Sequence, residues 1–429
     1  MWIPAAIHWA KAPWNHTSCP PQAPSPVSYV DVRRSALAVA SPPATQKQRR
    51  LRWSELQEHL TGYLFILPAV LLVALFGLFP IGYAFYMSLR RWRVVDRGFI
   101  GLANYEKALG DWWGALMFAG GFGILIVAYY VWQWATKAET DRGFFTKALV
   151  AFILMAGGVF IGFGWGRMMA AGDDDFLNSL PITLYYALGS VPLQLAIALV
   201  LAYILFQKIR GQEGFRMIFF LPYVTPVIAT ALVFRTIFSP RATSLANQAL
   251  EFVGLPAQKW LFEPRPLLEI LVGSDTLFGR SIEGFWAGPS LAMVSIILFG
   301  IWTYVGYNTV IFLAGLGNIP NELYEAAEID GANHWRLFRH ITIPLLSPVT
   351  FYLSLIGFIG TFKAFNHIYV MQEPSAQGTV ETASVAIFNT FFKASQFGYA
   401  TAQAMLLFGI ILFLTYVQNK IFGERVFYG

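Results

Sequence analysis

The chain has 429 residues, of which 56% are hydrophobic, 17% aromatic and only 13% charged. Because soluble domains carry about 25% charged residues, this composition excludes a string of soluble domains and indicates a protein that crosses a membrane several times. The single cysteine, Cys19, excludes an internal disulfide bond and any metal site built from several cysteines.

Segment 1–59 is expected to be a disordered, basic tail. Its first 52 residues carry seven bases and one acid, which accounts for the whole formal net charge of +6. The prolines and serines between Pro20 and Pro26, together with the lack of a long apolar run, favour disorder and do not fit a signal peptide. We expect no nucleic-acid partner, since the excess positive charge belongs to this tail and the rest of the chain is neutral.

Eight uncharged stretches are long enough to form membrane-spanning helices, since a span needs about 20 apolar residues at about 1.5 Å per residue. They are residues 60–89, 112–136, 148–166, 176–207, 217–234, 284–321, 341–362 and 394–419. Their continuous apolar character excludes a β-barrel, so the predicted fold class is an all-α integral membrane protein with eight spans. The basic tail favours a cytoplasmic N-terminus, and eight crossings return the C-terminus to the same side.

Between the spans the sequence predicts distinct segments in chain order. Residues 60–111 hold the first span and an outer segment, and 112–172 hold a helix pair rich in glycine and tryptophan, which favours close packing or a lipid-facing flank. Asp173–Asp175 are interpreted as a solvated cap in preference to a calcium site. Segment 173–423 includes an outer loop at 239–286, whose aromatic residues and prolines predict folded structure at the membrane interface.

The loop at 318–345, between the sixth and seventh spans, begins with a predicted short helix. Pro320 is placed to open that helix, and acidic residues near its start favour the positive end of the helix dipole. Ala326 and Ala327 give the helix a flat surface that another backbone can approach closely. Gly331 supplies the left-handed residue that ends it.

A second short amphipathic helix is expected in the same loop. Trp335 and Phe338 recur at i and i+3 on one face, and Pro344 then starts the next span. The two helices form a helix–turn–helix on the membrane surface whose shape suits docking into a partner.

The sequence of this loop resembles the "EAA" loop of the membrane subunits of binding-protein-dependent ABC importers. The resemblance rests on Glu325-Ala326-Ala327, on Gly331, and on Ile341-x-Ile343-Pro344. The flanking sequence is similar to maltose-type carbohydrate permeases at four further places: Gly101–Tyr105, Leu221–Pro226, Phe312–Leu316 and Phe397–Ala400. The resemblance covers roughly residues 60–110 and 175–420. We interpret the segment between them, residues 112–172, as two extra helices inserted into a six-span core.

The resemblance implies a non-catalytic transport subunit in a bacterial or archaeal cell membrane. The implied partners are a second permease subunit, an ATP-binding cassette ATPase dimer that carries ATP and Mg, an extracytoplasmic solute-binding protein and a carbohydrate. No cofactor is expected on this chain, which also lacks a phosphate-binding loop of the Gly-x4-Gly-Lys-Ser/Thr type. The residues expected to couple to the ATPase are Glu325, Ala326, Ala327, Asp330, Gly331 and Pro344.

Polar residues at membrane depth are candidates for a sugar path, because amides and aromatic faces suit hydroxyl-rich solutes. The candidates are Gln194, Tyr304, Tyr307, Asn308, Lys363, Asn366 and Gln403. Other interpretations stay open: Lys363 can extend to the outer interface, the tyrosines can belong to an interfacial belt or to ordinary packing, and His367 can be a hydrogen-bonded helix contact.

Two alternative functions remain open at this point. The first is an ABC permease for a non-sugar solute such as glycerol phosphate, because a few polar side chains on unaligned helices do not fix a stereochemistry. The second is an ion-driven secondary transporter, which needs an ion site within the membrane. The lack of Asp and Glu in all eight stretches argues against proton coupling.

Overall fold

The computed structural model describes residues 53–137, 143–207, 210–274, 276–277, 280–281 and 284–423. These residues are almost entirely helical, and they divide into two compact units between Leu71 and Leu72. The first helix begins at Trp53, so the last seven residues of the tail predicted at 1–59 are helical and that boundary was placed too late. The rest of the predicted tail lies outside the described residues.

The eight predicted spans correspond to helices of the structure. In chain order they are α2 (Trp53–Val73) with η1 (Ala74–Leu78) and α3 (Phe79–Ser88), α5 (Trp112–Lys137), α6 (Gly143–Ala171), α7 (Asp174–Phe206), α8 (Gln212–Val224) with α9 (Val227–Ile237), α12 (Leu291–Gly317), α14 (His334–Leu337) with η4 (Phe338–Thr342), α15 (Ile343–Leu345) and α16 (Ser347–Phe362), and α19 (Phe397–Phe422). By length and composition, the described residues contain six single helices able to cross a membrane and up to eight spans if two bent pairs are counted.

Shorter elements connect these spans. They are β1 (Arg90–Trp92), β2 (Asp96–Phe99), α4 (Ala103–Leu109), α10 (Leu245–Phe252), η2 (Trp260–Phe262), α11 (Leu267–Val272), β3 (Thr276–Leu277), β4 (Arg280–Ser281), η3 (Gly284–Ala287), α13 (Asn321–Ile329), α17 (Asn366–Met371), η5 (Pro374–Ala376), α18 (Ala383–Phe388) and η6 (Asn389–Lys393). The strands form two antiparallel hairpins, β1 with β2 and β3 with β4. The outer loop is therefore folded, as its composition predicts.

Two of the spans are sharply bent. The chain turns by 95° between α8 and α9, where Thr225 is extended and Pro226 precedes the first turn of α9. A second bend of 62° separates the α14–α15 segment from α16 at Leu346. Proline has no backbone N–H to donate, so Pro226 favours a break at that point. Arg235, near the end of α9, pairs with Glu373.

The helices α5 and α6 form a closely packed pair in which glycine permits the contact. A Cβ on Gly164 would lie 2.5 Å from the backbone nitrogen of Phe118, and one on Gly121 would lie 2.9 Å from the carbonyl oxygen of Gly157. The expected glycine-mediated packing is therefore confirmed. At the end of the pair where α5 begins and α6 ends, Arg167 forms an ion pair with Asp111 at 2.5 Å.

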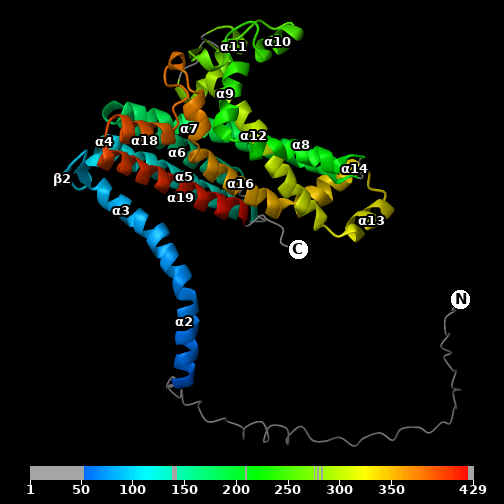
Figure 1. Ribbon diagram of the computed structural model, residues 1–429, viewed down its shortest axis with the longest axis horizontal. Coiled ribbons are helices and arrows are strands. Elements are labelled where there is room, and N and C mark those ends of the chain that lie inside the picture. The colour runs from blue at the N-terminus through cyan, green and yellow to red at the C-terminus, as the bar shows by residue number, and fades with distance from the viewer. Residues whose placement is uncertain are drawn as a thin grey trace, which may run out of the picture. The chain divides into compact units, whose positions relative to one another are not determined.

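The helix α12 lies at the centre of the core. In an apolar stretch of 18 residues within α12, 61% of the residues are buried. The corresponding share in α7, the next most buried span, is 39%. Its fully buried side chains include Met293, Ile296, Phe299 and Phe312, which pack in two apolar clusters. Figure 1 shows α12 running from the region that carries α10 and α11 to the region that carries α13.

Two of the sequence segments that carry the family resemblance meet at β1. The buried amide of Asn104 donates to the carbonyl oxygens of Ser88 at 2.7 Å and of Arg90 at 3.1 Å. A Cβ on Gly398 would lie 2.2 Å from the same Arg90 oxygen, so only glycine fits there. These contacts join the segment after the first span to the start of α19, almost 300 residues further along the chain.

Candidate functional site

The loop at 318–345 folds as the predicted helix–turn–helix. Pro320 is the N-cap residue of α13, and Gly331 has a φ of 82°, in the left-handed region. The N–H of Gly331 donates to Glu328 O at 3.0 Å, and that of Ala332 donates to Ala327 O at 2.9 Å. This pair of bonds is a Schellman motif, which satisfies the last carbonyls of α13 and favours glycine at its left-handed position.

Contacts to the spans hold this loop in place. The Tyr324 hydroxyl lies 3.1 Å from the hydroxyl of buried Thr342, so α13 is tied to η4. The ring of Phe338 lies 4.7 Å from that of Tyr203, which ties η4 to α7. Asn333 accepts a hydrogen bond from Arg336 N at 2.9 Å and caps α14. The loop is therefore attached to the helix bundle by contacts from both of its helical parts.

One face of the loop is exposed and combines acidic with large apolar side chains. Ile329 is 87% exposed and Trp335 is 63% exposed, although both are apolar. Glu325, Ala326 and Asp330 are exposed beside them. Exposed apolar residues of this size, rimmed by charge, are typical of a protein–protein contact.

The remaining predicted loop residues have different environments. Ala327 is half-buried, while Pro344 is exposed and lies inside α15. The main helix of the seventh span starts only at Ser347, after the 62° bend. Pro344 was predicted to start that span. It lies instead in the short helix α15, just before the main helix begins.

Three tyrosines form an aromatic surface where α8 meets α12. The ring of Tyr223 stacks on Tyr307 with centroids 4.6 Å apart and interplanar angle 24°, and lies 6.0 Å from Tyr304. Tyr223 and Tyr304 are each about 40% exposed, at 41% and 38%. The two predicted residues are thus joined by Tyr223, which the sequence analysis did not name as a site residue. Tyr304 and Tyr307 are spaced i, i+3 on α12, which predicts that they share a face of that helix. No local sequence pattern predicts that Tyr223 of α8 contacts them.

The predicted amides are buried at separate places. Asn308 is 5% exposed in α12, Gln194 is 4% exposed in α7, and Gln403 is 1% exposed in α19. The side-chain oxygens of Gln194 and Gln403 have no hydrogen-bond partner among the described residues. Such unpaired oxygens at membrane depth are costly, so each is a candidate acceptor for a solute hydroxyl or for water.

Lys363 and Asn366 do not lie inside a span. The seventh span ends at Phe362, Lys363 caps it, and both residues are exposed. Both residues therefore follow the last helical turn of α16, and their place at membrane depth stays a prediction. Their neighbour His367 is 4% exposed and lies 2.8 Å from the Tyr186 hydroxyl, which supports its interpretation as a helix contact.

The outer loop adds a polar pocket that the sequence analysis missed. It has a volume of about 290 Å³ and is lined by Gln258, Lys259, Glu263, Arg265 and Glu269 among others. No spacing rule connects these side chains, because they meet only when the loop folds. Among the described residues, no cluster of His, Cys, Asp and Glu could hold a metal ion.

Comparisons with known proteins agree with this architecture. The family model described as "Binding-protein-dependent transport system inner membrane component" matches residues 194–428. The arabinooligosaccharides transport system permease protein AraP of Bacillus subtilis (strain 168) is 30% identical over 61% of this chain and 76% of its own. The trehalose/maltose transport system permease protein MalF of Thermococcus litoralis is 24% identical over 85% of this chain and 94% of its own.

A solved structure shares the fold. It is described as a bacterial ABC transporter involved in the import of the acidic polysaccharide alginate. Its chain aligns with a TM-score of 0.57 and 16% sequence identity, over 87% of this chain and 98% of that chain. The helical fold of this chain therefore occurs in a solved ABC transporter structure.

Proposed function

Because the chain belongs to the family of binding-protein-dependent transport system inner membrane components, we propose that it is the permease subunit of an ATP-driven importer for a carbohydrate. Permeases of this kind are multi-pass proteins of the inner membrane and contribute helices, not chemistry, to transport. Relatives named for arabinooligosaccharides and for trehalose or maltose support a carbohydrate as the solute.

The observation that carries the proposal is the 318–345 loop. It presents Glu325, Ala326 and exposed Ile329 on a short helix that the Schellman turn and the Tyr324 contact hold against the bundle. A cleft in a separate cytoplasmic ATPase would cover this face. Closure of an ATPase dimer on ATP and Mg would then move α13, and with it the two spans that the loop connects.

Movement of those spans would switch the solute path between its two openings. The tyrosine surface of Tyr223, Tyr304 and Tyr307 offers aromatic faces to sugar rings, and the buried amides of Gln194 and Gln403 offer acceptors to hydroxyls. A second permease subunit would supply the opposite wall, since half-exposed tyrosines at membrane depth need a partner surface. An extracytoplasmic binding protein would deliver the solute to the side of the outer loop, with both chain termini in the cytoplasm.

The test is coupling in the assembled transporter. The chain is purified from its native membrane with its bound subunits and reconstituted, and solute-stimulated ATP hydrolysis and uptake are measured for Gly331→Val and Glu325→Ala. Valine is strained at φ 82°, so the first variant distorts the turn, and the second removes an exposed carboxylate from the docking face. Both variants should reach the membrane and lose coupled hydrolysis.

The control is Glu251→Ala, which removes an exposed carboxylate from α10 in the outer loop. It should retain wild-type coupling. Normal coupling in both loop variants would show that this loop is not the docking element. Purification of the chain alone, with uptake driven by an ion gradient, would refute an ATP-driven importer altogether.

A further inference from the structure

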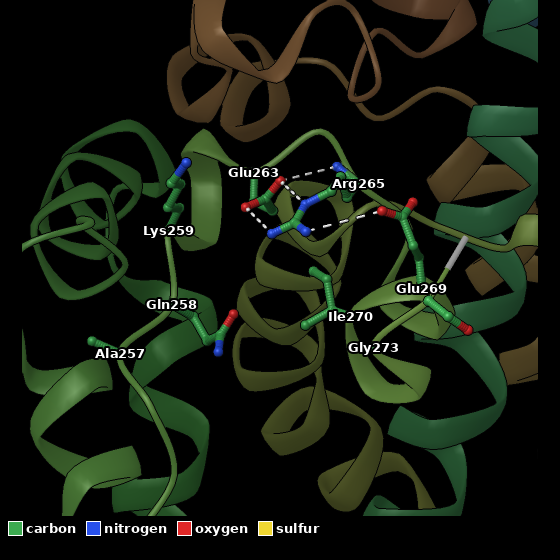
Figure 2. Close-up of a pocket in the computed structure, with 9 residues that line it drawn as sticks. Ala257, Gln258, Lys259, Glu263, Arg265, Glu269, Ile270 and Gly273 are labelled. Atoms are coloured by element: carbon green, nitrogen blue, oxygen red, sulfur yellow. Dashed lines mark hydrogen bonds and ion pairs between the residues drawn. The ribbon is translucent and has the colours of Figure 1, made fainter. Parts of the chain in front are cut away.

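The polar pocket of the outer loop is a preformed site. Figure 2 shows Arg265 between the carboxylates of Glu263 and Glu269, with Gln258 and Lys259 on the other side of the pocket. Glu263 is 4% exposed, and Arg265 donates to it from Nε at 2.9 Å and from Nη2 at 3.2 Å. A bidentate pair of this kind fixes the orientation of both groups.

The buried carboxylate stays ionised, because the hydrogen bonds from Arg265 hold the pKa of Glu263 below its ordinary value. The pocket lining therefore includes a hydrogen-bonded charge pair, in which Glu263 is buried and Arg265 is exposed. Around it, Lys259 is exposed, while Gln258 and Glu269 are half-buried. Glu269 lies 4.0 Å from Arg265 and the Gln258 amide donates to Pro256 O at 3.2 Å, so both side chains are held at the pocket rim.

The charges around the pocket select the class of ligand. Two cations, Lys259 and Arg265, stand beside two carboxylates, Glu263 and Glu269, so the lining has no net charge. An anion would meet the carboxylates and a cation would meet the bases. A neutral solute with many hydroxyls can instead donate to Glu269 and accept from Lys259 and the Gln258 amide.

We propose that this pocket is an outer subsite for one ring of a neutral carbohydrate, which it contacts through Gln258, Lys259 and Glu269. The volume of about 290 Å³ lies just below the usual range of about 300–1,000 Å³ for small-molecule pockets, which suits a single sugar unit. The inference rests on the proposed import of a carbohydrate and adds a second contact, away from the tyrosine surface.

Backbone hydrogen bonds attach the pocket to the central span. Leu291 N donates to Arg265 O at 3.0 Å, and Ala292 N donates to Glu263 O at 3.2 Å. Both donors belong to the first turn of α12, the helix that carries Tyr304 and Tyr307. The subsite is thus built on the outer end of the same helix that lines the candidate path.

The test measures direct binding without the solute-binding protein. The complex is reconstituted in nanodiscs, and saturation-transfer NMR reports binding of maltose, trehalose and arabinotriose, with glycerol 3-phosphate for comparison. The variant Gln258→Ala/Glu269→Ala should weaken binding of the transported sugar by roughly tenfold, as expected for the loss of two hydrogen bonds. Its KM for uptake should rise while kcat is unchanged, because uniform binding is lost.

The matched control is again Glu251→Ala, an exposed acid of the same loop that does not line the pocket. It should leave sugar binding and KM at wild-type values. Unchanged direct binding in the double variant would overturn the subsite, and a change in KM alone would assign the loop to docking of the delivering protein. If the wild-type complex transports none of the neutral sugars, the proposed function itself fails, and the subsite with it.

Discussion

Gly306 marks the closest approach between α12 and α8, and an added methyl group there should separate the two helices. A Cβ on Gly306 would lie 1.7 Å from Phe219 O and 3.0 Å from Phe220 N. Ordinary contacts begin near 3.4 Å, so the helices would have to move apart by at least about 1.5 Å. Both contacted atoms belong to the backbone of α8, so a change of side-chain rotamer cannot relieve the clash.

The expected cost of Gly306→Ala is about 1–3 kcal/mol, the usual range for overpacking a close interface. The change should also impair transport, because Tyr223 lies one helical turn beyond Phe219 and would be drawn away from Tyr307. Their ring centroids are now 4.6 Å apart. The assays are thermal unfolding in detergent and solute uptake in proteoliposomes, and both the apparent melting temperature and the affinity for solute should fall.

Gly409→Ala in α19 is the matched control. Nothing lies within 4 Å of a Cβ at Gly409, so alanine fits there. Because alanine is better than glycine inside a helix by roughly 0.5–1 kcal/mol, this variant should be as stable as wild type or slightly more stable. If Gly306→Ala unfolds at the wild-type temperature and transports with wild-type affinity, the close approach of α12 and α8 and its support of the tyrosine surface are refuted.

Three further predictions concern packing, capping and pH. Gly164→Ala should lower the melting temperature, because its Cβ would lie 2.5 Å from the α5 backbone. Gly162→Ala should not, because nothing lies within 4 Å of a Cβ there. Equal melting temperatures in the two variants would contradict glycine-mediated packing. Asp173→Ala removes the N-cap of α7 and the acceptor of the Tyr399 hydroxyl, so it should cost about 2 kcal/mol in thermal unfolding, a loss that Asp173→Asn should largely avoid. The pKa of Glu263 is lowered by Arg265, so its ionised form stabilises the fold above the ordinary pKa of 4.5 and less as pH falls below that value. Glu263→Gln should therefore be less stable than wild type near pH 7 by a margin that holds down to about pH 4.5 and shrinks as pH falls further, and a margin that stays constant below that pH would contradict the ion pair.

The spans and the loop helix could be predicted from sequence because their signals are local. An apolar run of about 20 residues needs no neighbour to be recognised, and the structure has a helix at each predicted stretch. The turn at Gly331 is equally local, since the Schellman motif uses only atoms of α13 and of the three residues that follow it. Signals of this kind lie within a few residues of the feature that they predict.

Features that depend on how two helices cross could not be predicted from the sequence. The 95° turn between α8 and α9 follows Pro226, yet other prolines lie inside helices: Pro68, Pro181, Pro192 and Pro222. The stacking of Tyr223 on Tyr307 depends on the contact between α8 and α12, and no periodicity within one helix encodes it. The break after Phe362 was missed for a related reason, because hydropathy does not register the last hydrogen-bonded turn of α16.

The position of α12 explains why these separate features belong to one mechanism. At about 1.5 Å per residue its 27 residues extend about 40 Å, enough to cross the hydrocarbon core. Its first turn is hydrogen-bonded to the pocket residues Glu263 and Arg265, its middle carries Tyr307, and its last residue, Gly317, leads into the 318–345 loop. A helix that is buried over most of its apolar length cannot bend freely, so a displacement at one end moves the other. Under the proposed function, movement of the loop by an ATPase would reach the tyrosine surface and the outer pocket along this helix.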